Sequence, residues 1–173
     1  MLSEISSKAR GPKVPSLFGM ISELNIKALT EQKIGGTPLF LVDVKVKPAN
    51  KIEVFVDGPD HISVDECVSI SKHIEANLNR DEEDFELTVS SPGIDQPFKV
   101  LHQYQKYVGK EVSALKKDGI KIIGKLAGVN ENEIQVETKR TERGEKGKGK
   151  QTIIENITIQ LNQIKETKLI LPF

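Results

Sequence analysis

Lysine and arginine side chains are the groups most able to do chemistry in this sequence, and they gather in its second half. Residues 96–173 hold 15 Lys and Arg against 9 Asp and Glu, whereas residues 20–95 hold 7 against 15. The net charges of the two halves are therefore +6 and −8, although the whole chain is neutral. Basic side chains bind nucleic-acid phosphates and release their counterions. We expect the second half to bind RNA and the first half to face a basic protein.

Candidate RNA contacts fall into two groups. The first group flanks a hairpin that Asp118-Gly119 predicts, and alternation along its strands would bring some members onto one outer face. The second group lies in residues 139–150, which hold six positive and two negative charges, three glycines and no apolar residue. This composition predicts a flexible basic loop between two strands. The candidates are Lys116, Lys117, Lys121, Lys125, Lys139, Arg140, Arg143, Lys146, Lys148 and Lys150.

Two other interpretations of these basic residues stay open. Surface lysines also keep a protein in solution and protect strand edges from unwanted pairing. Residues 139–150 can equally form a disordered insertion that has no ligand. The RNA hypothesis therefore depends on where the fold places these side chains.

Catalytic and metal-binding chemistry has little support in the sequence. The three histidines, His61, His73 and His102, do not have the spacing of metal ligands. Cys67 and His73 lie six residues apart, which puts them on different faces of a helix. The carboxylates of residues 81–84 are typical of a solvated loop. We predict a binding protein that is not an enzyme and that uses no metal or cofactor.

The single cysteine and the apolar pattern predict the compartment. Cys67 has no second cysteine to pair with, which fits a reducing compartment and predicts a buried structural thiol. No apolar run approaches the roughly 20 residues that a membrane helix needs. We therefore expect a cytoplasmic protein that does not bind membranes. Residues 1–19 follow neither a helical nor a strand period, which predicts a flexible tail or an artefact of the assigned start.

The spacing of apolar residues predicts an α+β domain over residues 20–95. Ser63 and Glu66 form a capping box, which is a strong signal for the start of a helix. The alternation of apolar and polar residues predicts an antiparallel hairpin before this helix and a third strand after it. A helix would then cover one face of the sheet. The predicted order is a helix from Ile21 to Gly35-Gly36, strands over 38–47 and 51–57, a helix over 64–78 and a strand over 85–90.

After Pro97 the pattern changes to a linker helix within residues 96–107 and then to closely spaced strands. Tyr104 and Tyr107 of this helix are expected to pack against the strands rather than to stack on bases. Five short strands in about 75 residues predict a small closed or half-closed β-barrel over residues 108–173. The strands are predicted over 112–116, 120–129, 134–138, 152–160 and 163–169.

The octet from Ser90 to Pro97 joins the two predicted domains. Its two prolines fix φ, and Gly93 can adopt a positive φ, so we expect a stiff turn. Paired hydroxyls and open backbone amides can also bind phosphate, but a turn without a ligand is the favoured interpretation. The positions that define the junction are Ser90, Ser91, Pro92, Gly93, Asp95, Gln96 and Pro97.

Residues 86–98, together with the hairpin at 41–57 and the helix start at 64–71, resemble the bacterial ribosome maturation factor family RimP. The resemblance extends over roughly residues 20–169. It implies an N-terminal α-β-β-α-β domain followed by a small SH3-like or Sm-like β-barrel. It also implies a factor for late maturation of the small ribosomal subunit that contacts a basic ribosomal protein and rRNA near the decoding region.

Two residues depart from the pattern of that family. Gln96 stands where Arg is usual, and Phe98 stands where Leu is usual. If the Arg contacts phosphate, that contact is weaker here, because Gln offers hydrogen bonds but no charge. The alternative function is that of an Sm-like RNA-binding regulator that acts through a ring of barrels. We expect a monomer, and a monomer would exclude such a ring.

Overall fold

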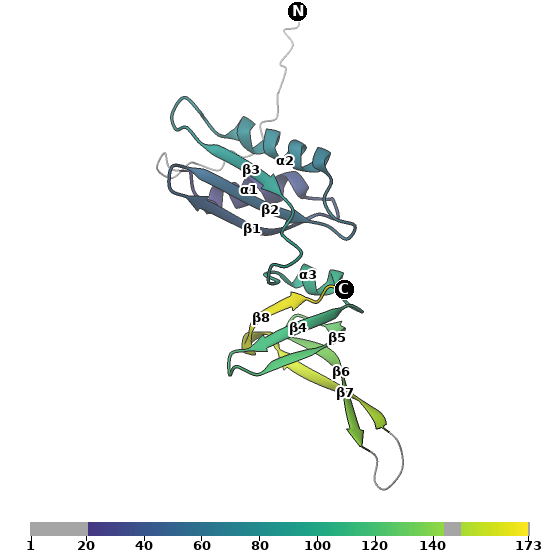
Figure 1. Cartoon of the computed structure of the whole chain (residues 1–173). Helices are drawn as coiled ribbons and strands as arrows, with labels where there is room; N and C mark the ends of the chain where they lie inside the picture. Colours follow the sequence, from purple (N-terminus) through teal and green to yellow (C-terminus); the bar gives the residue numbers. More distant parts are fainter. Residues whose placement is uncertain (1–20, 144–149, 173) are drawn as a thin grey trace, which may run out of the picture.

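The computed structural model describes residues 21–143 and 150–172, which contain two β-sheets (Figure 1). Residues 21–90, here called the α+β unit, contain a three-stranded sheet in the order β1-β2-β3. Residues 98–172, here called the sheet unit, contain a five-stranded sheet in the order β7-β6-β5-β4-β8. The prediction of a mixed α+β fold is therefore confirmed.

The α+β unit has the predicted order of elements. β2 pairs with β1 in antiparallel fashion and with β3 in parallel fashion, and α2 makes the crossover between β2 and β3. The tight turn before β2 places Ala49 and Asn50 at positive φ. The elements are α1 (Glu23–Ile34), β1 (Phe40–Lys47), β2 (Lys51–Asp57), α2 (Val64–Asn77) and β3 (Glu86–Ser90).

Both helices pack on one face of the three-stranded sheet (Figure 1). The central strand β2 presents three fully buried residues, Ile52, Val54 and Val56, to this core. Each is two residues from the next, so all three point to the same face of the sheet. This core is what gives the α+β unit its stability, because apolar burial is the dominant favourable term in folding.

Helix α2 begins at the predicted capping box. The Ser63 hydroxyl accepts a hydrogen bond from the backbone N–H of Glu66, and the Ser63 N–H donates to the Glu66 carboxylate at 2.8 Å. These hydrogen bonds from Ser63 lower the pKa of Glu66. The prediction for Cys67 was wrong, because its side chain is only half-buried, where burial raises the pKa of the thiol. Cys67 lies at the edge of the core face of α2, between the buried Ile70 and Ile74 and the exposed Val64 and Val68.

The sheet unit starts with the predicted linker helix. Its β-strands pair only in antiparallel fashion. The elements are α3 (Leu101–Lys106), β4 (Glu111–Lys116), β5 (Lys121–Val129), β6 (Glu133–Arg143), β7 (Lys150–Gln160), the short 3-10 helix η1 (Leu161–Gln163) and β8 (Ile164–Leu169).

The five strands form a sheet whose two edges are β7 and β8. Among the described residues no ladder joins these edges, so the prediction of a closed barrel is not supported. The short helix η1 carries the chain away from β7, and β8 then pairs with β4. Alternation along single strands is the same in an open sheet and in a closed one, which is why the pattern could not separate them.

The strands β6 and β7 continue further than the sequence pattern predicted. They pair from Glu133 and Gln160 out to Arg143 and Lys150. The prediction that all of residues 139–150 form a loop was therefore wrong, because 139–143 belong to β6 and Lys150 begins β7. The β-branched residues of β7 oppose these polar positions and favour extended backbone. Figure 1 shows this two-stranded ribbon extending beyond the rest of the sheet.

A close approach of backbones occurs inside the sheet unit. Gly124 of β5 lies opposite the buried Val112 of β4. A Cβ atom on Gly124 would lie 2.3 Å from the carbonyl oxygen of Glu137 and 2.9 Å from Cγ1 of Val136. A side chain at this position would therefore force β5 and β6 apart.

Candidate nucleic-acid interface

Two of the candidate lysines lie on the solvent-facing side of the five-stranded sheet. The buried Leu126 points into the core, so the alternating residues Lys121, Ile123 and Lys125 point the other way, and all three are exposed. We call this side the outer face. The expectation that the hairpin would bring some of its lysines onto one face thus matches the placement of Lys121 and Lys125.

The outer face continues onto the ribbon of β6 and β7. Lys125 pairs with Glu137 of β6, and Lys139 lies two residues further along the same strand, so both project from the same side. Lys139 pairs with Ile154, and Lys150 lies four residues before Ile154 on β7, which puts Lys150 on that side too. The fold therefore brings Lys121, Lys125, Lys139 and Lys150 onto one surface.

Three other candidates do not join this surface. Lys116 donates a hydrogen bond to Asp118 at 2.8 Å, and this bond lowers the pKa of the Asp118 carboxyl. Lys117 lies in the turn after β4, where its backbone N–H donates to the carbonyl of Gln163. Arg140 alternates with Lys139, so it lies on the opposite side of the ribbon, where its Nε is 3.3 Å from a Glu142 carboxylate oxygen.

Three basic candidates lie near or beyond the end of β6 in the sequence. Lys146 and Lys148 lie outside the described residues. Arg143 ends β6 and pairs with Lys150 along the backbone. These three residues stay predictions.

The outer face also carries groups that the sequence analysis did not select. Lys168 of β8 pairs with Ser113 of β4, and Ser113 pairs with Ile123 of β5, so Lys168 shares the face with Ile123. Ile123 is 54% exposed and Ile154 is 59% exposed, which leaves apolar surface between the charges. The signal for Lys168 was missing because the pairing of β8 with β4 joins segments far apart in sequence. Carboxylates are interspersed, since Glu137 lies beside Lys125.

The junction octet forms a turn that closes on itself. The backbone N–H of Gln96 donates to the carbonyl of Gly93 at 3.0 Å, and the Gln96 side-chain amide donates to Asp95. Gly93 does not use the positive φ that glycine permits, because it is not in the left-handed region. The glycine instead leaves room for Asp95, whose Oδ1 would lie 2.7 Å from an added Cβ. A phosphate would meet this carboxylate, so the turn does not favour an anion.

Aromatic residues fix the linker helix to the sheet unit. The ring of Phe98 lies edge-on to Tyr104, with centroids 5.1 Å apart, and stacks on Tyr107 at 5.2 Å. The Tyr104 hydroxyl donates to the Thr167 hydroxyl on β8, and burial raises the pKa of Tyr104. The prediction that both tyrosines pack against the strands is confirmed. Neither ring is free to stack on a base through both of its faces.

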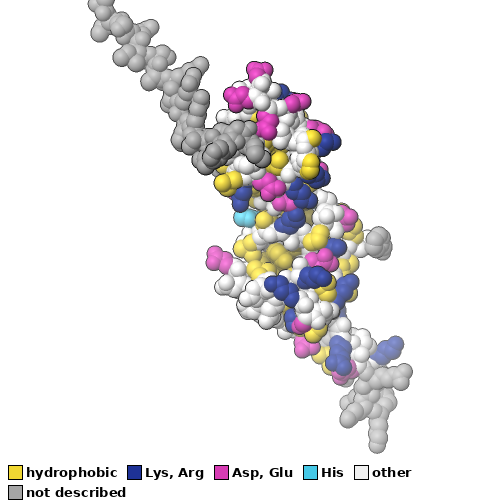
Figure 2. Space-filling model, turned by 90° about the vertical axis from the view of Figure 1, so that its left-hand side faces the viewer, with side chains coloured by type: hydrophobic (Ala, Val, Ile, Leu, Met, Phe, Trp, Pro, Cys, Tyr) yellow, Lys and Arg dark blue, Asp and Glu magenta, His cyan; other side chains and the backbone are white. Residues whose placement is uncertain are grey.

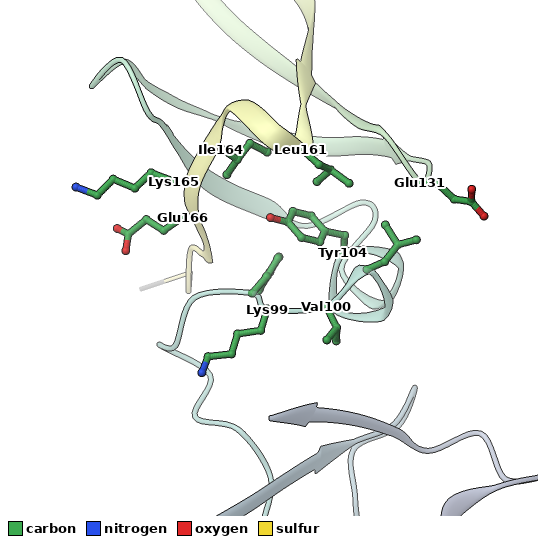
Figure 3. A pocket seen from close by; sticks show the side chains of 10 residues that line it. Lys99, Val100, Tyr104, Glu131, Leu161, Ile164, Lys165 and Glu166 are labelled. Carbon is green, nitrogen blue, oxygen red and sulfur yellow. The ribbon is translucent and has the colours of Figure 1, made fainter. Parts of the chain in front are cut away.

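A cleft of about 290 Å³ lies where the linker meets η1 and β8 (Figure 3). Tyr104, Leu161 and Ile164 give it an apolar surface. Its charged residues are of both signs, which gives no preference for an anion over a cation. They are Lys99, Glu131, Lys165 and Glu166.

The three histidines lie in separate surroundings. His61 lies 3.1 Å from the Lys106 ammonium, His102 stacks on Phe40, and His73 lies on α2, where burial lowers its pKa. Within residues 21–143 and 150–172, no three His, Cys, Asp or Glu side chains gather as metal ligands. The helices in these same ranges are too short or too polar to cross a membrane.

The fold is that of a mixed α+β protein whose five-stranded sheet carries several lysines on its outer face. Comparison with known proteins makes this class specific. Residues 29–95 match the model of the RimP N-terminal domain. The chain is 35% identical over 147 residues to the ribosome maturation factor RimP of Porphyromonas gingivalis, which covers 85% of this chain and 97% of the relative.

Two further relatives carry the same name. The RimP of Flavobacterium psychrophilum is 36% identical over 149 residues, which is 86% of this chain and 96% of the relative. The RimP of Christiangramia forsetii is 35% identical over 135 residues, which is 78% of this chain and 88% of the relative. The chain belongs to the RimP family, and the resemblance that residues 86–98 indicated is confirmed.

Proposed function

We propose that this chain is a ribosome maturation factor that assists late assembly of the small ribosomal subunit. The observation that carries the proposal is the opposite charge of its two parts in a member of the RimP family. Residues 20–95 have a net charge of −8 and residues 96–173 a net charge of +6. In this proposal the sheet unit binds rRNA, and the α+β unit binds a basic ribosomal protein near the decoding region.

The RNA side of the proposal rests on the outer face. Lys121, Lys125, Lys139 and Lys150 share it, and the exposed Ile123 lies among them. Lysines on a sheet surface contact phosphates without reading sequence, so they position a protein on RNA rather than select a sequence. The structured ribbon of β6 and β7 would extend this contact beyond the rest of the sheet.

The protein side rests on the carboxylates of the α+β unit. Figure 2 shows Asp and Glu side chains gathered at the upper end of the molecule, and Lys and Arg side chains along its lower part. A negatively charged surface attracts basic proteins and repels RNA. The two units would therefore meet different components of the subunit.

The proposal includes finer points of fold and state. We infer that residues 20–95 and 108–173 are two domains joined by the linker at 96–107, and that the second is SH3-like. Five antiparallel strands with a 3-10 helix before the last one support this inference. We also infer that the protein acts as a monomer in the cytoplasm, without catalysis and without a cofactor.

Co-sedimentation tests the proposed partner. The purified protein should sediment with free small ribosomal subunits and not with mature ribosomes, as measured by immunoblotting of sucrose-gradient fractions. A factor for late assembly must leave when the subunit is complete, which is the reason for this difference. Equal binding to mature ribosomes, or binding to nothing larger than the protein, would contradict the proposal.

The salt dependence of RNA binding tests the outer face. Replacement of Lys121, Lys125 and Lys139 by alanine should weaken binding to purified small-subunit rRNA. The slope of log affinity against log salt is negative and should become shallower by about 2 to 3, because each lost phosphate contact reduces its magnitude by nearly 1. Filter binding at a series of KCl concentrations, from about 50 to about 300 mM, measures this slope.

Arg140→Ala is the matched control for this measurement. It removes a positive charge from the same ribbon, but Arg140 lies on the other side and beside Glu142. Its slope should equal that of the parent chain. If each removed charge changed the slope by the same amount in the triple variant and in the control, net charge alone would explain the effect. The outer face would then have no role of its own.

A further inference from the structure

The linker helix α3 lies between the two units (Figure 1). On one side it is held to the sheet unit, because the Tyr104 hydroxyl bonds to Thr167 and the N–H of Phe98 donates to the Thr167 carbonyl at 2.8 Å. On its other side α3 meets the strands of the α+β unit. Any change in the angle between the units must therefore alter the contacts of that second side.

A buried ion pair forms the centre of these contacts. The ammonium of Lys106, the last residue of α3, lies 2.8 and 2.9 Å from the two carboxylate oxygens of Asp57, the last residue of β2. The side chains of Lys106 and Asp57 are only 6% and 4% exposed. Among the ion pairs of the described residues, this one has the least exposed side chains.

The loop after β2 supports the same ammonium group. His61 places its Nδ1 3.1 Å from Lys106 Nζ. Its backbone has a φ of 69°, which residues with a Cβ atom rarely adopt. Such a conformation persists where the surroundings determine it. Lys106 is thus held by two residues of the α+β unit.

Two weaker contacts join the units beside this pair. Lys99 pairs with Asp43 of β1, although both side chains are partly exposed. Figure 3 shows Lys99 extending from the linker toward the strands of the α+β unit. The ring of His102 stacks on Phe40 with centroids 5.0 Å apart.

The physical character of the ion pair makes it specific for one angle. Small interfaces between domains usually allow relative motion. Apolar contacts tolerate sliding, whereas a buried charge that loses its partner carries a large desolvation cost. Salt also screens a buried pair much less than an exposed one. The arrangement of Asp57 and Lys106 therefore favours a single orientation.

We propose that Asp57 and Lys106 are positioning residues that fix the angle between the α+β unit and the sheet unit in the free protein. The pair thereby sets the geometry between the acidic surface and the basic outer face before any partner binds. The role of this geometry in binding rests on the proposed function, whereas the fixed angle does not.

Distance measurements in the full chain test the fixed angle. Spin labels are attached to Lys72→Cys on α2 and Lys117→Cys in the turn after β4, in a chain with Cys67→Ser. Electron–electron resonance should give one narrow distance distribution. Asp57→Asn and Lys106→Met should each broaden it and remove its single maximum. Asp60→Asn, an exposed carboxylate three residues away, is the matched control and should leave the distribution narrow.

Lys106→Arg distinguishes the charge from the shape of the side chain, since it keeps the charge and should keep the narrow distribution. A narrow distribution in both Asp57→Asn and Lys106→Met would overturn the proposal. The proposal would also be overturned if circular dichroism showed that both variants are unfolded, because the pair would then be needed for folding rather than for the angle between the units. Co-sedimentation of the folded variants separately shows whether the angle affects ribosome binding.

Discussion

Replacement of Gly124 by alanine should lower the free energy of unfolding by about 2–3 kcal/mol. The added Cβ would lie 2.3 Å from the Glu137 carbonyl oxygen, and this neighbour is backbone that cannot rotate away. Strands β5 and β6 would have to separate where Leu126 and Val136, both buried, lie opposite each other. Urea denaturation followed by circular dichroism measures the change.

Gly128→Ala is the control in the same strand. The nearest heavy atom to its added Cβ is the Gln135 side-chain oxygen at 3.6 Å, an ordinary contact. The free energy of unfolding should change by no more than about 0.5 kcal/mol. Equal losses in the two variants would mean that the absence of a side chain in β5, rather than the close approach at Gly124, sets the stability.

Truncation of Phe98 to alanine should cost roughly 3–5 kcal/mol of stability. Phe98 is only 9% exposed, and its ring touches both tyrosines of the linker region. The cavity left by the ring would loosen α3 from the sheet unit. The measurement is again urea denaturation, with tyrosine fluorescence as a probe close to the site.

Phe98→Leu supplies the comparison, because leucine is also apolar but has no ring. Leucine fills most of the space and should cost about 1 kcal/mol. A loss as large as that of Phe98→Ala would show that the stacking of the ring on Tyr107, and not the filled volume, holds the linker.

Features set by neighbouring residues were predictable from sequence. The capping box at Ser63 and Glu66 lies within one helical turn, so the start of α2 followed directly from it. The faces of Lys121 and Lys125 follow from strand alternation alone. The hairpin of β1 and β2 likewise needs only one tight turn and two alternating segments.

Features set by contacts between distant segments were not predictable. The pair of Asp57 and Lys106 spans 49 residues, and each side chain alone reads as an ordinary surface charge. The selection of Lys168 depended on the pairing of β8 with β4. For the same reason the sequence could not show that β7 and β8 are the edges of an open sheet rather than neighbours in a closed barrel.

Two local features show how neighbouring residues change what a residue type suggests. Glycine permits a positive φ, but Gly93 does not adopt one, and its turn uses the space for the Asp95 carboxylate instead. Lys116 was selected as a candidate RNA contact from its charge, and it stays a prediction, although Asp118 two residues later accepts a hydrogen bond from it. Composition counts charges, whereas the fold decides which of them are already neutralised.

The position of β8 in the five-stranded sheet has a consequence for synthesis on the ribosome. The α+β unit is complete once β3 has emerged, so it can fold while the rest of the chain is still being made. The sheet unit must wait, because its last strand pairs with its first strand, β4. Until then one edge of β4 presents open backbone groups, and nascent chains that stop before β8 would expose this edge to pairing with other chains.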